Sequence, residues 1–159
     1  MAYLPILSAK MAVKYAIEAT AGAGRPTSGY TTINGVKSIS ADNDAPNTAQ
    51  VTELKDYPDH VNILALNNSG ATHSITVNDY KVFRDSWNTM YTAYTEAAAA
   101  GKTMWVEYAY PPGNEMDSYY YPAIPSPLGF GGAEVDAPLE NIVHFVKAGQ
   151  HVFATASTV

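Results

Sequence analysis

The residues of this chain that could carry out chemistry are few and scattered. None of its 159 residues is a cysteine, which excludes a disulfide scaffold, a thiol nucleophile and any cysteine-ligated metal site. The four histidines, His60, His73, His144 and His151, include no pair at the i,i+4 spacing of a zinc-binding helix. His144 and His151 would face each other across a C-terminal hairpin, where a structural role is the more frequent one. We therefore expect neither a metal nor another cofactor.

Two glycine-containing segments match nucleotide-binding loops only in part. The run Gly101-Lys102-Thr103 has the end of a P-loop, but the first glycine of that motif is missing and the helical pattern precedes the lysine. Gly22 and Gly24 lack the third glycine and the preceding strand of a dinucleotide-binding fingerprint. Neither segment predicts a nucleotide site.

Hydrolytic chemistry has as little support. The sequence contains no Gly-x-Ser-x-Gly elbow for a nucleophilic serine. Glu107 and Glu134 would act as paired carboxylates only if two strands brought them together, which the sequence does not require. Asn67-Asn68-Ser69 has the pattern of a glycosylation sequon, but the N-terminus lacks the basic and apolar regions of a signal peptide, so we expect a turn there. The sequence thus predicts no enzyme.

The composition favours a chain whose surface lies against other molecules. Its formal charge of −6 argues against a dedicated nucleic-acid binder, because affinity for phosphates comes from Lys and Arg. Charged residues make up 15% of the chain, where about 25% is usual, and 12 residues are tyrosines, a type favoured at interfaces. Either the chain is simply rich in Tyr and Ala, or much of its surface is covered by copies of itself or by a partner.

The strongest element in the pattern is a helix at residues 85–100, where apolar residues recur at every third or fourth position. Asp79 or Asp85 would cap its start, and Gly101 would end it. Trp87 is expected to be its main buried anchor, because a tryptophan removes a large apolar area from water.

Short strands account for most of the remaining chain, which suits a single domain over residues 1–159. They are expected at 30–40, 51–54, 61–66, 73–77, 102–110, 119–124, 142–147 and 151–155. Hairpins are predicted around 67–70 and around Gly149-Gln150, Asn34-Gly35 is a turn or a bulge, and Pro122 suggests an edge or an end of its strand. Residues 9–20 form either a short helix or an extended arm, and Trp105 is a second expected core anchor. The pattern indicates a mainly β fold, a β-sandwich or barrel with one helix packed on it.

Several stretches, read together, resemble the major tail protein family of bacteriophage tail tubes. The resemblance spans residues 25–155, and the segment 1–23 has no counterpart in it. The stretches that carry it are 25–39, the Asx- and proline-containing loop that follows, Val51-Thr52-Glu53-Leu54, the Ser86-Trp87 helix, 101–108 with Pro111, and 125–130 with Val135 and a glycine-containing C-terminal hairpin.

The resemblance implies a β-sandwich subunit whose sheets join those of its neighbours into a ring-shaped intersubunit β-barrel. Six copies would form a ring, and stacked rings would form a tube through which DNA passes without specific binding. The implied partners are the chain itself, a tape measure protein during assembly, and tail terminator and distal tail proteins at the tube ends. The implied location is the virion tail, after synthesis in the host bacterial cytoplasm. Within this frame, residues 1–29 are an N-terminal arm and 85–100 the flanking helix.

Residues 41–59 correspond to the loop that in this family commonly mediates stacking between rings. Its acidic residues are expected to lie between rings or along the bore, where like-charge repulsion would keep DNA phosphates from adhering. An ordinary solvated loop is the alternative for each of them. The residues are Asp42, Asp44, Glu53, Asp56 and Asp59.

Two other functions stay open at this point. A carbohydrate-binding β-sandwich module would use exposed tyrosines such as Tyr119, Tyr120 and Tyr121 to stack on sugar rings. The inner tube of a contractile tail, of an R-type bacteriocin or of an injection system would share the ring architecture.

Overall fold

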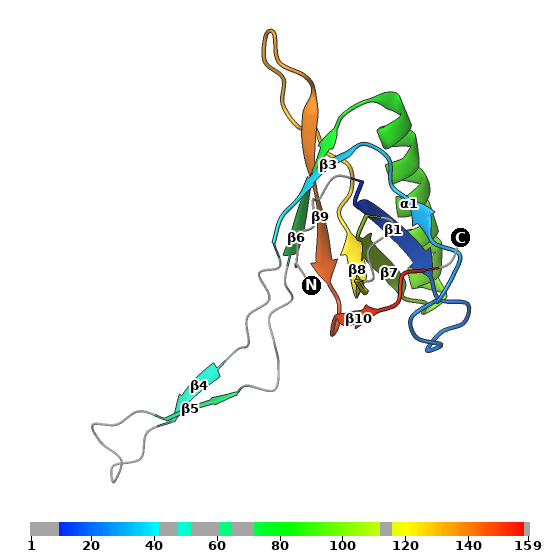
Figure 1. The fold of residues 1–159 in the computed structure, drawn as a ribbon, viewed down its shortest axis with the longest axis vertical. Helices are drawn as coiled ribbons and strands as arrows, with labels where there is room; N and C mark the ends of the chain where they lie inside the picture. The colour runs from blue at the N-terminus through cyan, green and yellow to red at the C-terminus, as the bar shows by residue number, and fades with distance from the viewer. Residues whose placement is uncertain (1–9, 42–47, 52–60, 65–71, 112–115, 158–159) are drawn as a thin grey trace, which may run out of the picture.

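The computed structural model describes residues 10–41, 48–51, 61–64, 72–111 and 116–157 (Figure 1). It confirms the fold class, which is mainly β with one helix. The elements are β1 (Ala12–Ile17), β2 (Thr31–Thr32), β3 (Val36–Ile39), β4 (Thr48–Val51), β5 (Val61–Leu64), β6 (Thr72–Asn78), α1 (Lys81–Ala99), β7 (Met104–Ala109), β8 (Ser118–Pro125), β9 (Glu140–Lys147) and β10 (Val152–Ala154).

The larger sheet has eight antiparallel strands and consists of two halves that share β8. Its order is β2-β1-β7-β8-β9-β6-β3, and β10 also pairs with β8. Residues 118–120 of β8 pair with β10, whereas residues 123–125 pair with β9. We call β2-β1-β7-β8-β10 the first half and β8-β9-β6-β3 the second half.

Pro122 lies in the middle of β8, not at an edge or an end as the sequence suggested. It stands directly before the stretch that pairs with β9 and after the stretch that pairs with β10. A proline cannot donate a ladder hydrogen bond, so it is tolerated where the strand changes partner on that side.

Both expected hairpins are wrong. β5 pairs with β4 in a separate two-stranded sheet, and β6 pairs with β3 and β9. β10 pairs with β8 and not with β9. Turn residues between two strands indicated adjacency, but the partner is decided by which buried faces match, and Ile75 lies directly opposite the equally buried Val143.

Two stretches near the N-terminus also differ from expectation. Residues 12–17, inside the segment expected to be an arm, form β1, which pairs with β7 along its whole length. The stretch 30–40 is divided between β2 and β3, which lie at opposite edges of the sheet. Gly35 makes the division possible, since its φ of 83° favours glycine and an added Cβ would lie 2.8 Å from the Tyr80 ring.

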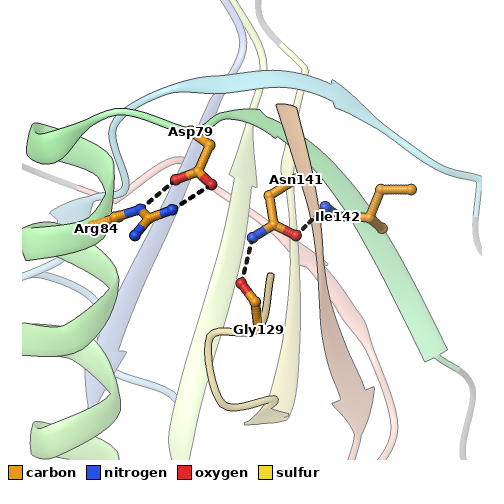
Figure 2. A network of polar contacts seen from close by, with 5 residues as sticks. All are labelled: Asp79, Arg84, Gly129, Asn141 and Ile142. Atoms are coloured by element: carbon orange, nitrogen blue, oxygen red, sulfur yellow. Dashed lines mark hydrogen bonds and ion pairs between the residues drawn. The ribbon is translucent and has the colours of Figure 1, made fainter. Parts of the chain in front are cut away.

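Helix α1 begins at Lys81, four residues before its predicted start, and neither candidate aspartate caps it. The N-cap is Tyr80, without a side-chain cap. Asp79 lies one residue too early and binds the guanidinium of Arg84, with Nε–Oδ1 and Nη2–Oδ2 distances of 2.6 and 2.8 Å (Figure 2). Asp85 lies inside the helix and pairs with Lys81.

The core lies between α1 and the inward faces of both halves. Trp87 is fully buried, its ring centroid is 5.2 Å from that of Phe145, and its indole Nε1 donates to the Ser126 carbonyl oxygen at 3.1 Å. Val106 on β7 belongs to the same core, so Trp105 next to it faces the other side of the strand and is only partly buried. Of the two expected core anchors, Trp87 therefore lies at the centre and Trp105 outside it.

Candidate functional site

The outer face of the first half carries a buried carboxylate. Glu107 on β7 and Tyr120 on β8 are cross-strand partners, and both are fully buried. The C-terminal segment lies over them, because the backbone N and the Oγ of Ser157 donate to the Glu107 carboxylate at 3.0 and 2.6 Å. The Tyr120 hydroxyl donates to the Thr155 carbonyl oxygen at 2.7 Å.

The segment after β1 also lies over this outer face, where it contacts Tyr120. The Arg25 guanidinium carbon lies 4.4 Å from the centroid of the Tyr120 ring, and Tyr30 meets that ring edge-on at 5.7 Å. Burial raises the pKa of Tyr30 to about 12. On the outer face of the first half, Glu107 and Tyr120 are thus covered by two segments of their own chain.

The electrostatics of Glu107 fit a structural role. Burial is the largest single influence and would raise the pKa of its carboxyl group, but the hydrogen bonds from Ser157, together with the nearby hydroxyl groups of Tyr120 and Ser118, outweigh it and the net pKa is lowered. Glu134, its proposed partner, lies exposed in the loop between β8 and β9. The Glu107 carboxylate is therefore occupied in holding the C-terminal segment and does not form a catalytic pair.

The two partial nucleotide motifs meet at one internal anion. The backbone amides of Gly22 and Gly24 donate to the Glu18 carboxylate at 3.1 Å each, and that of Thr103 donates at 2.9 Å. The hydrogen bond from Thr103 is the largest cause that lowers the pKa of Glu18. The amides do form an anion-binding nest, but a side chain of the same protein fills it.

No segment of the described chain covers the outer face of the second half. On β9 Ile142, His144 and Val146 are exposed, with Ile142 56% accessible. Hydroxyl side chains of β6 lie opposite them, and Ile124 on β8 lies opposite Val146. We call this surface the open face; it consists of Thr72, Ser74, Thr76, Ile124, Ile142, His144 and Val146. None of these side chains is an acid, a lysine or an arginine, and at one end the surface borders the ion pair between Lys37 and Glu140.

Among the described residues, the same half ends in a strand edge that no other strand pairs with. There β3 is the last strand of the sheet and hydrogen-bonds to β6 on one side only. A free edge presents backbone N–H and C=O groups that can pair with another chain. The opposite edge of the sheet, β2, is only two residues long.

A loop of residues 126–139, which we call the β8–β9 loop, extends beyond the end of the second half (Figure 1). Phe130 is 82% and Val135 91% accessible. The base of the loop is fixed, because the Asn141 side-chain amide donates to the Gly129 carbonyl oxygen at 2.9 Å and accepts from the Ile142 amide at 2.8 Å (Figure 2).

The histidines are dispersed and serve packing. His73 is buried and stacks on the Tyr121 ring at 4.3 Å, and His144 lies within 3.0 Å of the Ser74 hydroxyl. His151 contacts Tyr119 through its ring, so the expected pairing of His144 with His151 is wrong because their strands do not pair. His60 lies outside the described residues. Within the described ranges, no group of three or more His, Asp or Glu could hold a metal ion.

The remaining residues predicted from the sequence either lie outside the described residues or are buried. Asp42, Asp44, Glu53, Asp56 and Asp59 all lie outside the described residues. Tyr119, Tyr120 and Tyr121, the residues of the carbohydrate-binding alternative, are at most 7% accessible and therefore cannot stack on a sugar ring from solvent. The described part of the chain contains no helix that is both long and apolar enough to span a membrane.

Neither a protein-family model nor a curated protein matches this sequence. A solved chain from the tail of an empty GTA particle, refined with helical and C6 symmetry, matches with a TM-score of 0.53 and 14% identity over 91% of this chain and 96% of that chain. A chain from the sixfold-symmetrised cryo-EM structure of the anti-feeding prophage (AFP) baseplate matches with a TM-score of 0.57 and 9% identity over 96% and 98%. These likenesses establish a shared fold along nearly the full length of each chain.

Proposed function

We propose that this chain is the structural subunit of a phage tail tube, forming stacked hexameric rings around a DNA-conducting lumen. The observation that carries the proposal is the uncovered second half of the sheet, with its open face and its free β3 edge. The shared fold with chains from a particle tail and from a baseplate, both determined with sixfold symmetry, supports the same role.

On this proposal, the ring closes through strand pairing at the free β3 edge. A strand of the neighbouring copy pairs with β3, and six such pairings close an intersubunit barrel in which no edge is left exposed. The neutral open face then packs against a neighbour, as expected of an interface core, which is depleted in charged residues. The low charged fraction of 15% follows from this use of the surface.

The negative charge of the chain suits a conduit for DNA. Each copy carries a formal charge of −6, which a ring multiplies sixfold, and a negative bore repels the phosphate backbone. We propose that the acidic residues of the inter-ring loop supply part of this field. They are Asp42, Asp44, Glu53, Asp56 and Asp59.

Replacement of these five acids by lysine tests the charge proposal. The expected result is that DNA ejection slows or stops, because lysines at the bore would bind phosphates, while tube assembly is also impaired. Ejection assays and electron microscopy of the tails measure the two effects. Unchanged ejection and unchanged assembly would exclude a role for this loop.

On this proposal the chain acts without catalysis, in the virion tail, beside a tape measure protein during assembly and terminator and distal tail proteins at the tube ends. The inner tube of a contractile tail or of an injection system is the second candidate, since the fold is also shared with a baseplate chain. A sheath gene beside the gene for this chain would favour that second candidate.

Negative-stain electron microscopy of the concentrated full-length protein tests the proposed function. We expect rings or hollow tubes with sixfold symmetry. Compact single particles at every concentration would contradict it.

A further inference from the structure

On the inner face of the sheet, one end packs against α1 and the other end borders a cleft. Ile75 and Val77 of β6 share the core cluster with residues of α1, whereas His73 on the same face of β6 lines a cleft of about 780 Å³. A cleft of this size accommodates several side chains at once. Its apolar and aromatic lining comes from four further strands and from the start of the described chain, and includes Met11, Ile39, Tyr108, Tyr119 and Phe153.

The described residues that line the cleft include two lysines, Lys10 and Lys37, and no Asp or Glu. Lys37 also pairs with Glu140 of its own chain, so Lys10 provides most of the net positive charge at the rim. The cleft therefore combines an aromatic floor with a weakly basic rim.

The β8–β9 loop has the complementary chemistry. Its exposed apolar side chains, Phe130 and Val135, stand beside Glu134 and Asp136, and the loop contains no Lys or Arg. Apolar side chains this exposed are held in water at a cost unless a partner buries them.

The loop is shaped in advance of any contact. Gly131 packs so closely on β9 that an added Cβ would lie 2.5 Å from the Glu140 carbonyl oxygen. Asp136 has a φ of 64° in the turn that it forms with Val135, a side chain that is 91% accessible. A preorganised loop loses little conformational entropy when it binds.

We propose that the β8–β9 loop of one copy docks Phe130 and Val135 into the cleft of the next copy, with its two carboxylates against the basic rim. The loop leaves the sheet at the Asn78–Glu140 pair, whereas the aromatic part of the cleft around His73 lies at the other end of β6. The cleft reaches the loop end of the sheet only through Val36 and Lys37. Loop and cleft are different surfaces, so the contact is head-to-tail and repeats from copy to copy, as a ring or a stack requires. The inference rests on the proposed function, for which it names one contact between copies.

The absence of cysteine makes a direct test possible. One chain carries Val135→Cys and another Phe153→Cys, at an exposed position that lines the cleft beside Tyr119. The two full-length chains are mixed and treated with a short bismaleimide. We expect a covalent dimer from the mixture and not from the Val135→Cys chain alone. Thr92→Cys, exposed on α1, replaces Phe153→Cys in the matched control, which should give no dimer.

A second variant separates docking from chance encounter. Adding Phe130→Ser to the Val135→Cys chain should lower the dimer yield at limiting concentration about 10- to 100-fold, the loss expected when one buried aromatic anchor is removed. Circular dichroism confirms that each variant is folded.

The outcomes are distinguishable. Equal cross-linking of the Thr92→Cys control, or no cross-link although microscopy shows rings or tubes, would overturn the contact and leave the proposed function standing. Absence of both cross-link and rings would overturn the two together. Slow maleimide labelling of the cysteine at position 153 in dilute monomer would mean that the chain fills its own cleft, which would also overturn the contact.

Discussion

The two halves of the sheet share β8 and the same core, yet their outer faces differ. In the first half the segment after β1 and the C-terminal segment cover Glu107 and Tyr120 completely. In the second half the corresponding face leaves Ile142 and Val146 in solvent, next to the free edge of β3. One chain therefore completes one half of its sheet and leaves the other incomplete.

This difference separates what the fold needs from what assembly needs. Residues of the covered half and of the core should control the free energy of unfolding of a single copy. Residues of the open face should leave that free energy nearly unchanged and control association instead. Variants in the two regions can test this division.

The largest effect on folding is expected at the core. Trp87→Ala should lower the free energy of unfolding by about 3–5 kcal/mol, because it removes a fully buried indole and leaves a cavity between α1 and Phe145. Denaturant unfolding of the dilute, unassembled protein measures it. Near-wild-type stability would contradict the packing described for α1.

A smaller effect is expected on the cover of the first half. Glu107→Gln should lower the free energy of unfolding at pH 7 by about 1.5–3 kcal/mol, because the amide cannot accept both hydrogen bonds from Ser157. The exposed Glu134 provides the matched control, and Glu134→Gln should change stability by less than about 0.5 kcal/mol.

The pH dependence sharpens this test. The folded pKa of Glu107 is lowered, so its contribution to stability is complete above the ordinary glutamate pKa of 4.5 and disappears as the pH falls through the folded value. The stability difference between wild type and Glu107→Gln should therefore shrink under acid. A difference that stays constant from pH 7 to the acid limb would show that the carboxylate is not the source.

The smallest effect on folding is expected at the open face. Ile142→Thr with Val146→Thr should change the free energy of unfolding by no more than about 0.5 kcal/mol, yet it should abolish rings and tubes. Val82→Thr, which alters an equally exposed apolar side chain on α1, should preserve assembly. Normal rings from the double variant, or loss of rings from Val82→Thr, would contradict the assignment of the open face.

Local patterns predicted the elements better than their partners. The three- and four-residue spacing identified α1, and the alternation of Met104, Val106 and Tyr108 identified β7. The pairing of β10 with β8 and of β5 with β4 was missed, since nearby turn residues suggested hairpins that matching between distant strands overrides.

The candidate site was predicted less well for a similar reason. Ile142 and Val146 are residue types typical of a core, and only the structure shows that both are exposed and that no described segment packs on them. The role of Glu18 was also missed, although Gly22 and Gly24 gave a partial signal of an anion site. The glycines in the sequence indicate backbone amide donors, but the sequence does not show that the anion they bind is a carboxylate of the same chain.

Hydrogen exchange, compared between dilute single copies and the concentrated assembled protein, tests most directly whether the second half is completed by other copies. The amides of β3 and of the β8–β9 loop should become protected on assembly, while those of α1 and β7 should not change. Protection that is absent, or that appears on α1 and β7 and not on β3, would contradict the claim that other copies complete the second half of the sheet.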